Sequence, residues 1–165
     1  MIADAHLDIA WNAISAGRGF LSDPAPGYLV SHSSLARAGV GLVCATLYCA
    51  PARARRSMRT RFTYGTPHEA HLMATAQLNY YRACGLPLLR TRAELEQYAR
   101  TWRRGSLAAI LLMEGADPVE DPSQLGAWAD AGVRIIGPAW GRTRYAGGTH
   151  APGGLTELGF RLLRA

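Results

Sequence analysis

A histidine and an aspartate stand two residues apart near the start of the chain, at His6 and Asp8. Residues i and i+2 of a β-strand point to the same face, so both side chains would project together from the end of a short strand over residues 1–5. An imidazole and a carboxylate that converge on one point suit a divalent metal such as zinc. The pair therefore predicts part of a metal site, with a purely structural hydrogen bond as the alternative.

A second carboxylate, Glu114, follows the apolar run 107–113, and glycines bound this segment on both sides. Such a run is typical of a buried strand, and a charge at its end is costly unless it is paired or bound to a metal. Hydrogen bonding to backbone amides is the plainer alternative. In β/α barrels the chemistry lies on the loops after the strand C-termini, where we expect His6, Asp8 and Glu114 to lie.

The elements that must position these residues alternate between apolar strands and capped helices. Strands are predicted over residues 1–5, 40–50, 107–113 and 132–140. Helices are predicted over 31–38, 67–84, 91–105, 121–131 and from 155 onward, with loops over 11–30 and 51–64. Capping boxes begin the helices after Thr66 and Thr91. This alternation predicts a parallel sheet with right-handed crossovers.

The predicted fold class is α/β, and more narrowly the N-terminal part, about four strands, of a (β/α)8 TIM-type barrel. A complete barrel typically takes about 250 residues, whereas this chain has 165. The last helical segment also lacks a terminator such as glycine. We therefore expect residues 1–165 to form a single domain, an incomplete barrel truncated at its C-terminal end.

Composition narrows the class of protein. The residues are 48% hydrophobic and 18% charged, which is typical of a globular protein. The net charge of +6 comes from arginine alone, since the sequence contains no lysine. Three cysteines without a CxxC pair indicate neither a disulfide framework nor a zinc ribbon. No apolar run is long enough to span a membrane and no signal peptide is evident, so we expect a cytoplasmic location and no membrane partner.

Five stretches, in this order and spacing, resemble the N-terminal half of the membrane (renal) dipeptidase family of zinc metallopeptidases. They are Asp-x-His-x-Asp at 4–8 followed by Trp-Asn, Gly-Val-Gly-Leu-Val-x-Ala-Thr-Leu-Tyr at 39–48, Met-Glu-Gly-Ala-Asp at 113–117, Gly-Val-Arg-Ile-Ile-Gly-Pro-Ala-Trp at 132–140, and Gly-Gly-Leu-Thr-Glu-Leu-Gly at 153–159. The resemblance implies a (β/α)8 barrel that binds two zinc ions and hydrolyses dipeptides.

The resemblance also implies roles for individual residues. His6 and Asp8 become ligands of one metal, and Glu114 becomes the catalytic carboxylate that bridges both. Two metals about 3.5–4 Å apart can polarise a scissile carbonyl and activate a water. The family's two further zinc-binding histidines lie on later strands, in sequence that this chain does not contain. Asp4 is expected to brace His6 or to support the ligands from behind.

Trp140 stands where many family members have a substrate-contacting histidine, which makes it a candidate substrate-binding residue. A tryptophan can stack on a substrate but cannot supply the same charge-assisted hydrogen bond. We therefore expect a substrate preference that differs from that of the typical dipeptidase.

Three other groups are interpreted as surface. His68 and His71 are spaced i, i+3 on one helix and could hold a metal, but no carboxylate partner is evident. His150 lies in a glycine-rich loop and could line the mouth of the site, although a plain loop position is the simpler interpretation. The arginines from Arg53 to Arg61 could attract an acidic substrate or a nucleic-acid backbone. Without a nucleic-acid-binding motif, we interpret them as a solvated loop that leans over the pocket.

The leading hypothesis is a zinc-dependent dipeptidase, a hydrolase that cleaves the peptide bond of dipeptides with a metal-activated water. Its expected partner is the small dipeptide substrate, with no nucleic acid, and a homodimer remains open. One alternative is a related amidohydrolase with a non-peptide substrate. Another is an inactive truncated or split half-barrel that needs a partner chain, and we expect the 165-residue chain alone to be inactive. The least favoured alternative is an arginine-rich anion or nucleic-acid binder.

Overall fold

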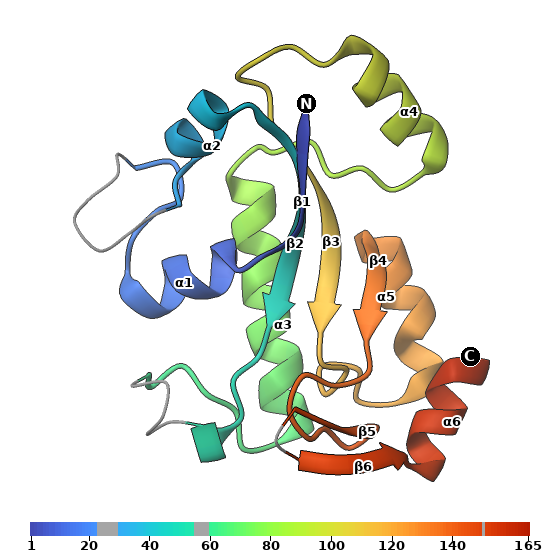
Figure 1. Ribbon diagram of the computed structural model, residues 1–165. Helices are drawn as coiled ribbons and strands as arrows, with labels where there is room; N and C mark the ends of the chain where they lie inside the picture. Colours follow the sequence, from blue (N-terminus) through green and yellow to red (C-terminus); the bar gives the residue numbers. More distant parts are fainter. Residues whose placement is uncertain (23–29, 55–59, 150) are drawn as a thin grey trace.

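Four parallel strands form the centre of the protein. The computed structural model describes residues 1–22, 30–54, 60–149 and 151–165. Its main sheet has the order β1-β2-β3-β4, so each strand lies beside the next one along the chain (Figure 1). The strands are β1 (Ile2–Leu7), β2 (Val40–Tyr48), β3 (Ala108–Glu114) and β4 (Val133–Gly137). The predicted α/β class and parallel sheet are confirmed, and sequential order is that of consecutive barrel strands.

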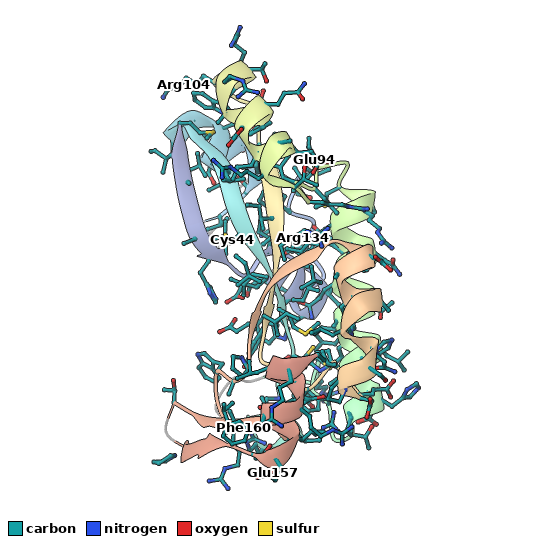
Figure 2. All side chains as sticks on the ribbon, turned by 90° about the vertical axis from the view of Figure 1, so that its right-hand side faces the viewer. Cys44, Glu94, Arg104, Arg134, Glu157 and Phe160 are labelled. Carbon is teal, nitrogen blue, oxygen red and sulfur yellow. The ribbon has the colours of Figure 1, made fainter. Side chains whose placement is uncertain are left out.

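Helices connect the strands and cover one face of the sheet. They are α1 (Ile9–Ala16), α2 (His32–Ala38), α3 (Pro67–Ala83), α4 (Arg92–Thr101), α5 (Leu125–Ala131) and α6 (Glu157–Arg164), with short 3₁₀ turns at Ala52–Ala54 and Pro122–Gln124. In Figure 2, α3 and α5 lie together on one side of the sheet. Within the described residues, no helix has the length and apolar character needed to cross a membrane.

The predicted capping boxes are present. The Thr66 hydroxyl accepts from the backbone N–H of Glu69 at 3.2 Å, and the Glu69 carboxylate accepts from the backbone N–H of Thr66 at 3.0 Å. Thr91 and Glu94 make the same reciprocal pair at the start of α4. These bonds satisfy amide groups that the first helical turn leaves unpaired.

Two segments differ from the sequence-based expectation. Residues 11–30 were expected to be a loop, but α1 extends to Ala16 and buries Ile9, Ala10 and Ala13. The glycine- and proline-rich composition that predicts a loop begins only at Gly17, which ends the helix with φ +66°. Residues 23–29 and 55–59 of the two expected loops lie outside the described residues.

The second difference is an antiparallel hairpin of β5 (Ala146–Gly148) and β6 (Ala151–Leu155), at the carboxyl ends of β3 and β4 (Figure 1). Its glycines let the two strands pack closely, because a Cβ on Gly147 would lie 2.6 Å from the backbone nitrogen of Gly153. The alternating hydrophobic pattern that predicts a strand is absent from this segment.

Successive side chains of β2 alternate between the face that packs in the apolar core and the face that carries the candidate site. Val43, Ala45 and Leu47 of β2 are fully buried in the main apolar core, to which α3 also contributes. Thr46, between Ala45 and Leu47, and Tyr48, after Leu47, point to the opposite face. The register pairs Tyr48 with Glu114, so both side chains reach the same end of the sheet.

Candidate metal centre

His6, Asp8 and Glu114 lie together at the carboxyl end of the sheet. His6 Nε2 is 3.1 Å from Glu114 Oε2 and 3.8 Å from Asp8 Oδ1. One potential ligand atom from each residue lies within 4.8 Å of the other two. Among the described residues, no other set of three histidine, cysteine or acidic side chains comes this close. The structure thus brings together the three residues for which the sequence predicts a ligand role.

The strands and the first helix place these three groups. His6 is near the end of β1, where the Asp4 carboxylate accepts from the His6 backbone N–H at 2.9 Å. Asp4 therefore hydrogen-bonds the backbone of His6, and its bracing role stays a prediction. Asp8 occupies the position before α1, and Glu114 is the last residue of β3.

The electrostatics of the site fit a cation. The Glu114 side chain is only 13% exposed. Its burial and the neighbouring Asp8 carboxylate raise the pKa of Glu114, while His6 lowers it. Burial, together with Glu114 and Asp8, also raises the pKa of Tyr48 to about 12. The charge-specific part of these shifts is the repulsion among the acidic groups, which a bound cation would relieve.

The donor set itself suits a divalent metal. One imidazole and two carboxylates are ligands that zinc and other divalent metals accept in catalytic sites. Three protein ligands also leave open coordination positions, a feature of catalytic rather than structural zinc sites. The residues present therefore fit the metal that the sequence predicts.

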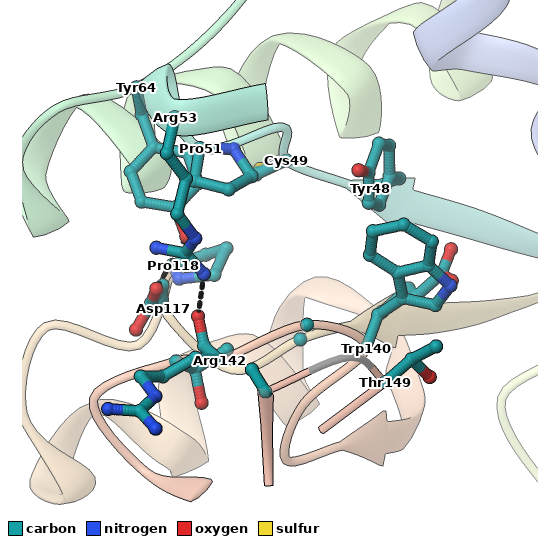
Figure 3. Close-up of a pocket in the computed structure, with 15 residues that line it drawn as sticks. Tyr48, Cys49, Pro51, Arg53, Tyr64, Asp117, Pro118, Trp140, Arg142 and Thr149 are labelled. Atoms are coloured by element: carbon teal, nitrogen blue, oxygen red, sulfur yellow. Dashed lines mark hydrogen bonds between the residues drawn. The ribbon is translucent and has the colours of Figure 1, made fainter. Parts of the chain in front are cut away.

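A pocket of about 230 Å³ adjoins Glu114. Figure 3 shows Tyr48 and Trp140 together at one side of this pocket and Arg53 with Asp117 at the other. The rings of Tyr48 and Trp140 meet edge to face with centroids 5.9 Å apart, and Trp11 packs against Tyr48 in the same manner at 5.5 Å. Trp140 is 47% exposed. The predicted substrate-binding residue therefore lines a pocket that it shares with Glu114, one of the three candidate metal ligands.

The far side of the pocket combines a paired acid with an arginine. The Asp117 carboxylate accepts from the Tyr64 hydroxyl at 2.5 Å and from the Arg144 backbone N–H at 2.9 Å. Both carboxylate oxygens therefore have a hydrogen-bond partner within the protein. The Arg53 guanidinium donates to the carbonyl oxygen of Arg142 (Figure 3). Part of the predicted arginine loop therefore does lean over the pocket, and residues 55–59 lie outside the described residues.

The interpretation of His68 and His71 needs correction, because both have a carboxylate partner. His68 Nδ1 is 3.0 Å from Glu120 Oε1, whereas His71 Nδ1 is 3.2 Å from the carbonyl oxygen of Pro118 and 3.9 Å from Glu120 Oε2. His71 is half-buried against the ring of Trp128 and is not a solvated surface residue. The sequence did not reveal Glu120 because it lies about 50 residues away, after the next strand. His150 lies outside the described residues.

Sequence reasoning also missed Thr46. This fully buried residue of β2 donates its hydroxyl proton to the Asp8 carboxylate. The available signal was a lone hydroxyl inside an apolar strand, two residues before the strand end. Its partner could not be named without the register between β1 and β2.

Comparisons with known proteins give the same fold. No protein-family model matches the chain, and no curated protein sequence matches it. The chain does match solved metallopeptidase structures. A metallopeptidase from Rhodobacter sphaeroides, bound to a phosphinate mimic of the dipeptide L-Ala-D-Ala, is similar with a TM-score of 0.75 and 21% identity over 99% of this chain and 54% of the other. The chain has the fold of a dipeptidase N-terminal half.

Two further solved structures have a similar fold. Dipeptidase AC, a metallopeptidase of family M19, has a TM-score of 0.72 at 21% identity. The match covers 99% of this chain and 52% of the dipeptidase chain. The probable dipeptidase PvdM from Pseudomonas aeruginosa has a TM-score of 0.72 at 18% identity, with 98% of this chain and 43% of its own covered. The chain thus spans about half the length of the solved dipeptidases that it matches. At this level of identity the likeness describes the fold.

Proposed function

We propose that this chain supplies part of the metal centre of a zinc-dependent dipeptidase, with His6, Asp8 and Glu114 as metal ligands. The observation that carries the proposal is the convergence of these three donors within 4.8 Å, at the carboxyl end of a parallel sheet. The similarity in fold to metallodipeptidases supports the same proposal. Two zinc ions are expected in the complete enzyme, and Glu114 is the ligand proposed to bridge them.

A bound divalent metal would supply Lewis acidity and would lower the pKa of a water, so that this water could lose a proton and act as the nucleophile toward a peptide carbonyl. The residues of the chain would perform the remaining tasks. The His6 ring must be neutral and present an unprotonated nitrogen to act as a ligand, and its Nε2 lies 3.1 Å from Glu114 Oε2, so the two donor atoms lie close together. Trp140 and Tyr48 would form an apolar wall for a substrate side chain, and Arg53 would attract a substrate carboxylate across the pocket.

A second candidate function, a half-barrel that needs a second half, is supported by the edges of the sheet. β1 and β4 are the two edges of the described sheet, so each has an unpaired side. Parallel edges of this kind favour association with further strands. A half-barrel that acts only together with a second half, from the same polypeptide or from another chain, would satisfy both edges. Sedimentation of the 165-residue chain tests this alternative, because a monodisperse, well-folded monomer would contradict it.

Metal content and dipeptide hydrolysis test the main proposal. Both are measured on the 165-residue chain and on the product of the full reading frame, with L-Ala-D-Ala among the substrates. His6→Ala and Glu114→Ala should each lower bound zinc and abolish hydrolysis. His68→Ala and Glu96→Ala are the matched controls, because both side chains are well exposed and remain outside the site. Undiminished zinc and activity in the two site variants would refute the proposal.

A further inference from the structure

A buried hydroxyl from the neighbouring strand is directed at one of the proposed ligands. Thr46 is completely buried on β2, and its Oγ1 donates to Asp8 Oδ1. The same oxygen is 3.4 Å from the carbonyl oxygen of Leu7. A hydroxyl has one proton to donate, and an ionised carboxylate is the stronger acceptor. The bond to Asp8 is therefore the principal interaction of this hydroxyl.

Asp8 occupies the N-cap position of α1 but does not cap the helix with its side chain. It is the residue before α1, where aspartate side chains commonly accept from the free amides of the first turn. Here the Asp8 side chain makes no such capping bond. Its carboxylate accepts from Thr46 and lies 3.8 Å from the His6 ring. The Asp8 carboxylate is thus oriented toward His6 and not toward the backbone amides of α1.

Thr46 itself is held firmly from the helix side of the sheet. The hydroxyl of Tyr81, a fully buried residue of α3, donates to the backbone oxygen of Thr46 at 2.9 Å. The same Tyr81 oxygen accepts from the backbone N–H of Ala10 at 3.2 Å, in the first turn of α1. One side chain therefore fixes the backbone on both sides of the Thr46–Asp8 bond. Threonine adds to this rigidity because its branched Cβ restricts χ1.

We propose that Thr46 is a positioning residue, whose hydroxyl holds the Asp8 carboxylate toward His6 and Glu114 and so increases the affinity of the site for a divalent metal. The inference rests on the proposed metal centre. Hydrogen-bond partners behind metal ligands commonly contribute about 10–100-fold to metal affinity, because they keep the ligand in its binding orientation. Thr46 would be such a partner.

The test compares the zinc affinity of three variants with that of the wild-type chain, by competition with a chromophoric chelator. Thr46→Val keeps the branched shape but removes the hydroxyl, and we expect it to weaken zinc binding about 10–100-fold. Thr46→Ser keeps the hydroxyl and should bind zinc as the wild type does. Tyr98→Phe is the control, because it removes a hydroxyl that donates to the Gly41 carbonyl at 2.8 Å near the other end of β2. This control should lower stability to urea but leave zinc affinity unchanged.

Two further measurements complete the test. One is the absorption spectrum of the variants with cobalt(II) bound, and the other is urea denaturation of the metal-free variants. A merely structural hydroxyl would change the denaturation midpoint but not the cobalt spectrum, whereas a positioning hydroxyl changes the spectrum. If Thr46→Val binds zinc as tightly as the wild type, the role of Thr46 is overturned while the metal centre stands. If Thr46→Ser weakens binding as much as Thr46→Val, side-chain packing and not the hydroxyl is responsible, which also overturns the inference. If His6→Ala in the product of the full reading frame binds zinc as the wild type does, the metal centre itself is refuted.

Discussion

Replacing Gln77 by leucine should destabilise the protein strongly, although this residue is remote from the pocket surface. Gln77 is completely buried on α3. Its side-chain amide accepts from the Tyr48 backbone N–H at 3.0 Å and donates to the Tyr48 backbone oxygen at 2.6 Å. The side chain thus takes the place of a neighbouring strand at the end of β2. Leucine has a similar volume but can make neither bond.

The expected loss follows from the two buried hydrogen bonds that Gln77→Leu would remove. Removing the partner of a buried polar group costs about 1–3 kcal/mol, which gives about 2–6 kcal/mol for the two bonds. A typical domain has a free energy of unfolding of only about 5–15 kcal/mol. Urea denaturation followed by circular dichroism should therefore show a large fall in the midpoint. Because Tyr48 packs against Trp140, the variant should also lose affinity for ligands of the pocket.

Gln97→Leu is the matched control for Gln77→Leu. Gln97 has the same side chain on another helix, α4, but is exposed to solvent. Its replacement should change the free energy of unfolding by no more than about 0.5 kcal/mol. A loss below about 1 kcal/mol for Gln77→Leu would show that water or a shifted backbone satisfies Tyr48. That result would refute the reasoning.

Three further predictions concern pH and the pocket. Hydrogen bonds from the Arg90 and Thr91 backbone amides hold the pKa of Glu94 below its usual value. This stabilisation is present above the unfolded pKa and is lost as pH falls through the lower folded pKa, so between about pH 5 and 3 the urea midpoint should fall further in the wild type than in Glu94→Gln. Arg53→Ala should reduce kcat/KM about tenfold for a dipeptide with a free carboxylate, while the corresponding dipeptide amide should be unaffected. Trp140→Ala should raise KM about 2–10-fold for substrates with large apolar side chains and leave KM for glycyl substrates unchanged.

The candidate metal ligands could be predicted from sequence because their signal is local. Glu114 ends an apolar run, and His6 and Asp8 have the spacing of one strand face, so each could be assigned to a strand end without further information. Parallel strands bring such ends to the same edge of a sheet. Their observed convergence therefore needed only the strand topology.

The supporting contacts could not be predicted because they depend on register and on side-chain placement. Thr46 is 38 residues from Asp8, and Gln77 is 29 residues from Tyr48. Nothing in the local sequence of either residue indicates its partner. The first helix was missed for a different reason, since its short buried face, ending at Ala13, directly precedes a segment rich in glycine and proline. Sequence patterns identify elements better than their limits.

The hydrogen bonds from α3 have a consequence for engineering. A library that varies only the residues visible in the pocket would include Trp140, which follows β4, and Arg53, which lies in the short 3₁₀ turn after β2. Gln77 and Tyr81 would be left out, although they fix the end of β2 and the beginning of α1 from behind the sheet. Substrate range should therefore evolve readily at Trp140 and Arg53. Positions 77 and 81 should tolerate almost no replacement in a deep mutational scan, and a stabilising background would be needed before either could be changed.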